Sequence, residues 1–144
     1  MTQEVSNALA EFFGAVDDRD WERTEALMTT PIHIDYASFG AGDPTDMDPS
    51  DVVGGWRKVL PGFDHTHHQL GNVQLWVDGD VATVNAYATA THVIDSEVWT
   101  VVGRYEILLR REPGWRLSSL RFLFRYQAGA THLREVAAGR ASAS

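Results

Sequence analysis

Three histidines stand close together in the segment DHTHHQLGN, at the start of a predicted strand. Because successive side chains of a strand point to opposite faces, His65 and His67 share one face, and His68 lies on the other face with Leu70. A neutral imidazole is the natural general base near pH 7. On an apolar face, His68 is therefore either a catalytic base or a hydrogen-bonded histidine of the core.

A zinc site is the second chemistry that paired histidines could support. His65 and His67 could both reach one metal ion, but structural and catalytic zinc sites need further ligands, and the neighbouring sequence offers no obvious third one. The chain contains no cysteine, which excludes a disulfide, a thiolate metal site and a cysteine nucleophile. We therefore predict no metal and no other cofactor.

The composition is that of one globular domain without acidic macromolecular partners. The chain has 144 residues, of which 44% are hydrophobic and 22% charged, and its net charge of -8 opposes binding to nucleic acid or to an anionic membrane. Its N-terminus lacks the pattern of a signal peptide, and no stretch approaches the roughly 20 apolar residues of a membrane span. We expect a cytoplasmic protein with a single domain over 1–144, an ordered core at about 3–138 and a flexible tail at 139–144.

The predicted helices lie mainly in the first part of the chain. Apolar residues at helical spacing predict an amphipathic helix over 3–16, and Asp20 is expected to cap a second helix that Pro31 ends. Residues 40–49 have the composition of a loop that could form a flap, and Pro49 opens a third helix. The second helix is expected to turn three residues inward: Trp21, Ala26 and Leu27.

Strand periodicity dominates the rest of the chain. Residues 32–39 alternate apolar and polar side chains, which places Tyr36 on the buried side. Sequences typical of tight turns separate four further strands and predict consecutive antiparallel hairpins. Helices followed by a meander of strands are typical of the α+β class, with the helices on one face of the sheet. The approximate bounds of the four strands are 65–77, 81–94, 97–111 and 114–127.

The buried face of the strand at 81–94 predicts a cavity rather than a solid core. It presents Ala86, Ala88 and Ala90 and ends in His92, and a row of small side chains suits the floor of a pocket better than a close-packed interior. A short helix in the segment THLREVA could close the mouth of this pocket. The aromatic lining predicts a small, apolar or aromatic substrate, and its members are Phe39, Trp56, Trp99, Tyr105, Phe122 and Phe124.

Three motifs resemble those of a known enzyme family. They are D-x-x-D-W-[DE]-R at 17–23, I-D-Y-x-S-F at 34–39, and T-x-H-x-x-G at 66–71. Over about residues 6–127 the chain is similar to scytalone dehydratase, whose superfamily includes nuclear transport factor 2, ketosteroid isomerase and the SnoaL-like polyketide cyclases. The resemblance implies a cone-shaped, cystatin-like half-barrel, in which a curved antiparallel sheet and N-terminal helices enclose a pocket.

The resemblance also implies the catalytic groups. It places the catalytic aspartate at Asp17, which would otherwise be read as a solvated acid near a helix end, the general-base histidine at His68, and two further pocket residues at Tyr36 and His92. In the implied dehydration, His68 takes a proton next to a carbonyl group while Asp17 fixes the His68 tautomer. Tyr36 hydrogen-bonds the carbonyl oxygen, and His92 or protonated His68 delivers a proton to the leaving oxygen. Stopping before the loss of oxygen gives an isomerase or an aldol-type cyclase, and both alternatives stay open.

The chain departs from scytalone dehydratase at three pocket positions. The second pocket tyrosine of that enzyme falls on Val16, and its pocket serine and asparagine fall on Gly103 and Tyr105. These differences argue against scytalone itself as the substrate. Tyr105 could replace the phenol that is lost at Val16, although it projects from a different strand.

Residues predicted on the outer face of the sheet bear on the remaining alternatives. Epoxide hydrolysis in this fold resembles catalysis by an Asp-Arg-Asp group that activates water. The inward faces of the predicted strands show no such group, and the arginines of the late strands are predicted to point outward: Arg104, Arg121 and Arg125. A non-catalytic domain that binds a small ligand or serves as a scaffold is the alternative from another class. Because Val98, Leu108 and Leu123 are also predicted on the outer face, we expect a homodimer or a homotrimer.

Overall fold

The computed structural model describes residues 2–143 and has the predicted order of helices first and long strands afterwards. No helix among these described residues is both long enough and apolar enough to cross a membrane. The elements are α1 (Thr2–Asp17), α2 (Trp21–Ala26), β1 (Met28–Asp35), η1 (Ala37–Phe39), β2 (Thr45–Met47), α3 (Pro49–Arg57), η2 (Leu60–Gly62), β3 (His65–Asp78), β4 (Val81–Ile94), β5 (Glu97–Arg111), β6 (Trp115–Gly129) and α4 (Leu133–Ala143).

One six-stranded sheet in the order β2-β1-β6-β5-β4-β3 organises the chain. β3 to β6 form consecutive antiparallel hairpins, as the turn sequences predict. β1 instead runs parallel to β6, because the whole meander separates these two strands and no tight turn fixes their relative direction. The α+β half-barrel is confirmed, with one parallel pair in a sheet that was expected to be antiparallel throughout.

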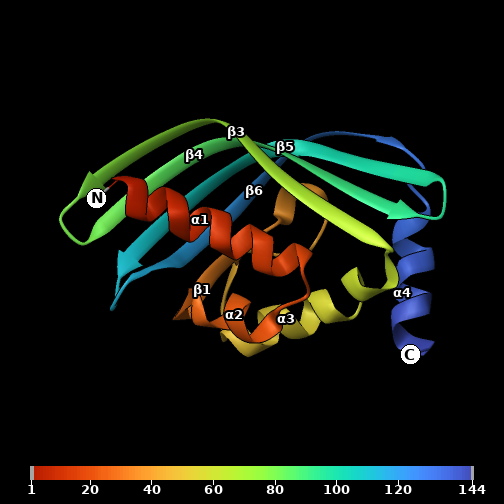
Figure 1. Ribbon diagram of the computed structural model, residues 1–144, viewed down its shortest axis with the longest axis horizontal. Helices are drawn as coiled ribbons and strands as arrows, with labels where there is room; N and C mark the ends of the chain where they lie inside the picture. The colour runs from red at the N-terminus through yellow and green to blue at the C-terminus, as the bar shows by residue number, and fades with distance from the viewer. Residues whose placement is uncertain (1, 144) are drawn as a thin grey trace.

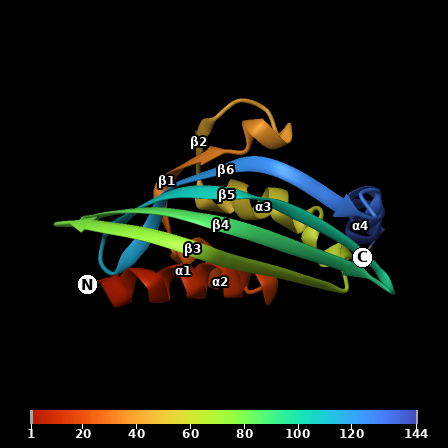
Figure 2. The ribbon, with the colours of Figure 1, turned by 90° about the horizontal axis from the view of Figure 1, so that it is seen from above.

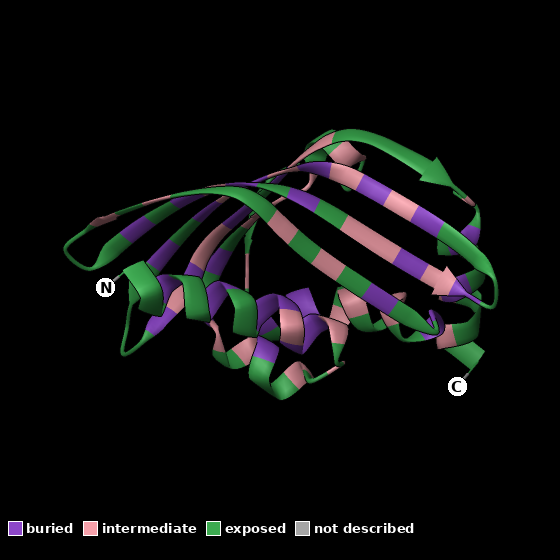
Figure 3. Ribbon diagram, turned by 45° about the horizontal axis from the view of Figure 1, so that its top comes forward, coloured by how far each residue is buried: buried purple, intermediate pink, exposed green. Residues whose placement is uncertain are grey.

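The sheet curves around the helices, which lie on its concave side (Figures 1 and 2). Interruptions of the register between β3 and β4 and at two places between β5 and β6 add bend and twist to the long strands. Buried residues recur at alternate positions along most of β4 and β5 (Figure 3), whereas β3 buries only Thr66. The amphipathic helix predicted at 3–16 is present, and the residues that α1 buries are Val5, Ala8, Leu9, Phe12, Phe13, Ala15 and Val16.

The second helix is shorter than the sequence predicts. α2 ends at Ala26, and Pro31 lies inside β1 instead of ending a helix. The reason is tertiary: Met28 pairs with Leu117 of β6, so the residues that follow α2 join the sheet. The predicted inward position of Ala26 is wrong, because Ala26 is exposed and Thr24 is the buried residue of this helix.

The I-D-Y-x-S-F motif ends a strand and does not continue it to residue 39. β1 stops at Asp35, whose carboxylate accepts the backbone N–H of Ala37 and so starts the short helix η1. The Ser38 hydroxyl then donates to the Phe122 carbonyl and accepts the Phe124 N–H, each at 2.8 Å. Ser38 thus takes the place of a neighbouring strand and fixes η1 to β6. In the segment 40–49, predicted as a loop, three residues form β2 and pair with β1.

Helix α4 packs closely against η2 at one end of the sheet (Figure 1). Gly62 makes this approach possible, because a Cβ atom there would overlap the main chain of Ala137. Arg140 adds a salt bridge of 3.1 Å to Asp64. The helix runs on to Ala143 and is therefore helical where the sequence predicts a flexible tail, while residue 144 lies outside the described residues.

Apolar side chains on the outer face are arranged as strand alternation predicts. Val98 and Leu108 are each 42% exposed, and Leu123 is half-buried. Arg121 is exposed on the same face and pairs with Glu106 at 2.9 Å, and Arg125 is exposed at the register shift of β6. Association between copies through this face stays a prediction.

The contact between η2 and α4 can be tested with two glycine variants. Gly62→Ala should lower the free energy of unfolding by about 1–3 kcal/mol, because the added methyl group forces α4 away from η2. Gly139 lies in α4, and a Cβ atom added there has no other atom within 4 Å. Gly139→Ala should therefore stabilise the protein by about 0.5–1 kcal/mol. Urea unfolding together with amide exchange in α4 measures both effects. Equal stability of Gly62→Ala and the wild type would contradict the close approach.

Candidate active site

A cavity of about 410 Å³ lies between the concave face of the sheet and the helices. This volume falls in the range of small-molecule sites. The alanine floor predicted on β4 is present at Ala88 and Ala90. Eight of the ten residues predicted for the site line this inner cavity, namely Tyr36, Phe39, Trp56, His68, His92, Trp99, Tyr105 and Phe122.

Phe124 and Asp17 are the two predicted site residues that lie outside the lining. Phe124 belongs to the inner side of β6, but its ring stacks on Phe39 with the centroids 4.9 Å apart, and Phe39 lines the cavity. Phe124 is therefore packed against a residue of the lining and is not part of it, and its contact with a ligand stays a prediction. Asp17 lies behind His68 and reaches the cavity only through that histidine.

Asp17 and His68 form a hydrogen-bonded pair. Asp17 is the last residue of α1, and its Oδ1 lies 2.7 Å from Nδ1 of His68 on β3. The backbone N–H of His68 donates to Oδ2 at 2.8 Å, and the Thr66 hydroxyl donates to Oδ1 at 3.1 Å. The two side chains are only 16% and 15% exposed. The carboxylate therefore accepts three hydrogen bonds at the junction of a helix and a strand.

These hydrogen bonds decide the protonation of the pair. Burial by itself would raise the pKa of Asp17, but the hydrogen bonds and the charge of His68, together with the Thr66 hydroxyl, hold the pKa below its ordinary value. Asp17 is thus ionised near neutral pH and accepts the Nδ1 proton. In the neutral ring, this bond selects the tautomer whose Nε2 carries no proton, which is the form that a general base requires.

His92 is a neutral histidine with a fixed tautomer. Its Nδ1 lies 3.1 Å from the Trp99 carbonyl oxygen, which can only accept, so Nδ1 carries the proton. The ring stacks on Trp99 and contacts Phe63, with centroid separations of 4.4 Å and 4.9 Å. Burial lowers the pKa of His92 to about 4. Near neutral pH its Nε2 is therefore a hydrogen-bond acceptor.

Two phenols meet at another part of the inner cavity. The hydroxyl oxygens of Tyr36 and Tyr105 are 3.3 Å apart, so one phenol donates to the other and the acceptor keeps its own proton for a third group. Burial raises the pKa of Tyr36 well above its ordinary value and that of Tyr105 to about 12. Both phenols therefore stay protonated, and Tyr105 supplies a phenol to the cavity from β5, as proposed for the one absent at Val16.

Charged residues stand among the lining residues contributed by three separate segments. They are Asp43 from the segment before β2, Asp51 on α3 and Arg134 on α4. The segment THLREVA, expected at the mouth of the pocket, thus contributes Arg134 to the lining. None of the three was predicted, because surface charges give no periodic signal.

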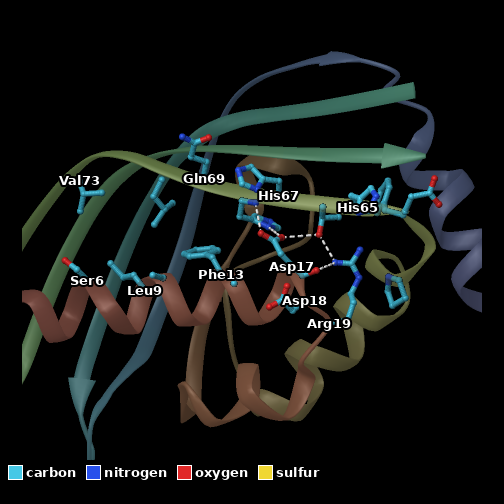
Figure 4. A pocket seen from close by; sticks show the side chains of 18 residues that line it. Ser6, Leu9, Phe13, Asp17, Asp18, Arg19, His65, His67, Gln69 and Val73 are labelled. Carbon is cyan, nitrogen blue, oxygen red and sulfur yellow. Dashed lines mark hydrogen bonds and ion pairs between the residues drawn. The ribbon is translucent and has the colours of Figure 1, made fainter. Parts of the chain in front are cut away.

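An outer groove of about 1040 Å³ runs between α1 and β3 on the other side of the pair (Figure 4). Asp17 lines this groove and His68 lines both hollows, so the pair forms part of the wall between them. His65 and His67 also line the groove. Within residues 2–143, no three side chains of His, Asp or Glu gather where they could hold a metal ion.

Two polar residues of the site were missed as functional groups. Thr66 belongs to a motif that gave it no role, and Arg19 donates to the Thr66 hydroxyl oxygen at 2.7 Å. Arg19 has a backbone φ of 60°, and hydrophobic periodicity does not reveal a side chain that folds back from such a turn. Its position two residues after the end of α1 is the one signal that the sequence gives.

Comparisons with known proteins agree with this fold. The family model of the SnoaL-like domain matches residues 2–121. The crystal structure of the Kfla4162 protein from Kribbella flavida is 26% identical, with a TM-score of 0.81 over 98% of this chain and 96% of the other.

Two enzyme-like structures are more distant in sequence. A candidate scytalone dehydratase from Novosphingobium aromaticivorans is 14% identical, with a TM-score of 0.75 over 90% of this chain and 87% of the other. A hexachlorocyclohexane dehydrochlorinase from Novosphingobium barchaimii is 17% identical, with a TM-score of 0.70 over 90% of both chains. At such identities these two show likeness of fold alone.

The neutral state of His92 predicts how stability depends on pH. The pKa of His92 falls from 6.5 in the unfolded chain to about 4 in the folded protein. The contribution of neutral His92 to the free energy of unfolding is therefore complete above pH 6.5 and is lost as the pH drops toward about 4. Between about pH 7 and about pH 4.5, the wild type should lose about 2–3 kcal/mol more than His92→Asn, at about 1.4 kcal/mol per pKa unit. Urea unfolding at several pH values measures this difference, and parallel pH profiles would contradict it.

Proposed function

Since the chain belongs to the SnoaL-like domain family, we propose that it is a cofactor-independent lyase. It removes a proton next to a carbonyl group of a small, largely apolar molecule, and the loss of water follows. The observation that carries this proposal is the bond of 2.7 Å between Asp17 and His68 in the wall of an aromatic cavity. A binding domain does not need an ionised carboxylate behind a cavity-lining imidazole, whereas a base catalyst does.

The first step is proton transfer from carbon to His68. Nε2 takes the proton, and the electrons of the C–H bond move into the carbonyl group to give an enolate. The negative charge of Asp17 stabilises the imidazolium that forms. The proton left free in the Tyr36–Tyr105 pair hydrogen-bonds the enolate oxygen as its charge develops.

The second step expels the hydroxyl group on the neighbouring carbon. The electron pair of the enolate forms the new carbon–carbon double bond, and the departing oxygen takes the Nε2 proton of His68 to leave as water. His68 is the better acid of the two histidines, because the single proton of neutral His92 is engaged by the Trp99 carbonyl. We therefore assign His92 the role of a hydrogen-bond acceptor for the substrate.

Elimination is favoured over the related reactions by the neighbours in fold. A dehydratase and a dehydrochlorinase, the activities after which two of the similar structures are named, both carry out eliminations. A SnoaL-like isomerase or polyketide cyclase is the alternative, because the same enolate can be reprotonated at another carbon or can attack a second carbonyl group. A non-catalytic binding domain would form no enolate at all.

Deuterium exchange separates these possibilities before the substrate is known. In D2O, a panel of aromatic β-hydroxy ketones is followed by NMR for deuterium next to the carbonyl group and by absorbance for the conjugated product. We expect exchange together with elimination for at least one compound. His68→Ala and Asp17→Asn should each lower that rate by about 10²–10⁴-fold.

The neighbouring residues provide matched controls for the two variants. Asp18→Asn and His67→Ala change the same residue types one position away, on side chains that line the outer groove and not the inner cavity. Both controls should keep the wild-type rate. If Asp17→Asn and His68→Ala retain the wild-type rate on an active compound, the proposed mechanism is refuted. If no compound that binds shows exchange, a binding domain is favoured.

The phenol pair predicts non-additive losses. Whichever tyrosine donates to the enolate oxygen, its replacement by Phe should lower kcat by about 10²–10³-fold. Because the two phenols act together, the double variant should lose little more than the worse single variant. Tyr87→Phe on the outer face is the control, since Tyr87 is 54% exposed. Unchanged kcat in the double variant would exclude the phenols from the reaction.

A further inference from the structure

Arg19 occupies a backbone position that normally favours glycine. The C-terminus of α1 closes with two hydrogen bonds, from Arg19 N–H to the Val16 carbonyl at 3.1 Å and from Asp20 N–H to the Ala15 carbonyl at 2.9 Å. This is the Schellman arrangement, in which the residue at the Arg19 position is left-handed and usually glycine. Arg19 has a φ of 60°. A long side chain at a position that disfavours side chains indicates that the side chain itself has a role.

The side chain of Arg19 lies beside the end of α1 and extends toward the start of β3 (Figure 4). It donates to the Leu60 carbonyl at 2.7 Å and to the Thr66 hydroxyl oxygen at 2.7 Å. It also donates to the carbonyl of Asp17 at 3.0 Å. One side chain therefore holds together the end of α1, the helix η2 and the start of β3, beside the Asp17–His68 pair.

The contact with Arg19 sets the direction of the Thr66 hydroxyl. A guanidinium has donors only, so Thr66 must accept from it and must direct its own proton elsewhere. The acceptor of that proton is Oδ1 of Asp17, at 3.1 Å, and Thr66 is buried. Oδ1 is also the atom that receives the Nδ1 proton of His68. Arg19 thus reaches His68 through two intermediate groups.

We propose that Arg19 and Thr66 are positioning residues of the proposed active site. The hydrogen bonds run in one direction from Arg19 to Thr66 and from Thr66 to Asp17, and they keep the carboxylate oriented so that His68 stays in the tautomer with a free Nε2. The catalytic meaning of this relay rests on the proposed function. The relay itself can be measured in the whole protein without a substrate.

The electrostatics around Asp17 support the relay. Burial acts to raise the pKa of Asp17, and the Thr66 hydroxyl is among the hydrogen bonds that lower it. Loss of that hydroxyl, or of the guanidinium that directs it, should therefore raise the pKa. The other groups whose charges act together with that of Asp17 are His68, His92, Tyr105 and the Arg19 guanidinium itself. The Thr66 variants leave all of these groups in place.

The test is an NMR titration of the Asp17 carboxyl carbon, with nitrogen shifts that report the His68 tautomer. Thr66→Val should raise the pKa of Asp17 by about 0.5–1 unit and add the second tautomer of His68, and Thr66→Ser should restore both. Arg19→Gly should give a shift in the same direction. This variant keeps the left-handed turn at no steric cost, so it separates the guanidinium from the backbone.

Two controls and the outcomes complete the test. Thr24→Val removes another buried threonine hydroxyl, which donates to the Asp20 carbonyl, and Arg23→Ala removes a surface arginine that pairs with Glu11. Neither should move the pKa of Asp17. The relay would be overturned if Thr66→Val and Arg19→Gly lower stability but leave the pKa of Asp17 and the tautomer of His68 unchanged. This holds even if the Asp17 and His68 variants lose activity. A shifted pKa with full activity in the Asp17 and His68 variants would keep the relay and refute the proposed function.

Discussion

The Asp17 carboxylate joins the end of a helix to the edge of the sheet. A largely buried carboxylate is tolerated only when its oxygens are hydrogen-bonded, and here three donors from β3 meet that requirement. The same bonds fix how α1 lies against the sheet and which nitrogen of His68 is free. The wall of the inner cavity and the orientation of the His68 ring in it therefore depend on one ionised group.

The inner cavity depends equally on the positions of small residues on the inner face of the sheet. Ala88 and Ala90 leave space above β4, and the aromatic rings of the neighbouring elements surround that space without filling it. Gly103 works in the opposite way. A Cβ atom at Gly103 would come within 2.6 Å of the Phe122 ring, so the absent side chain makes room for an aromatic wall and adds no volume to the cavity. Small residues on adjacent strands thus have opposite effects on the shape of the site.

The long strands could be predicted because their signal is local. β4 has the predicted bounds, and the alternation of its residues correctly placed His92 and the alanines on the inner face. The end of α2 could not be predicted, because the pairing of Met28 with Leu117 is a tertiary event. The Ser38 hydroxyl likewise makes hydrogen bonds to the backbone of β6 that a neighbouring strand would otherwise make, and sequence periodicity does not predict such a contact.

The site shows the same division between local and long-range information. Alternation alone turned His68 inward, but the assignment of Asp17 as its partner came from resemblance, since nothing in the spacing of the two residues indicates contact. The change of register in β6 also lies beyond alternation. After it, Gln127 accepts the indole N–H of Trp99 at 2.9 Å, a contact that a strictly alternating strand would not have suggested.

The edges of the sheet restrict how copies of this chain can meet. β2, at one edge, has only three residues, and β3, at the other, is interrupted between Gly71 and Gln74. α1 lies along β3, and the carboxylate of Asp17 occupies the amide of His68. Unpaired amides and carbonyls of an edge strand are the usual template for adding a strand from another molecule. Because neither edge strand offers a long, regular row of unpaired backbone groups, copies that associate are expected to do so through surface side chains. We do not expect one sheet to continue into the next.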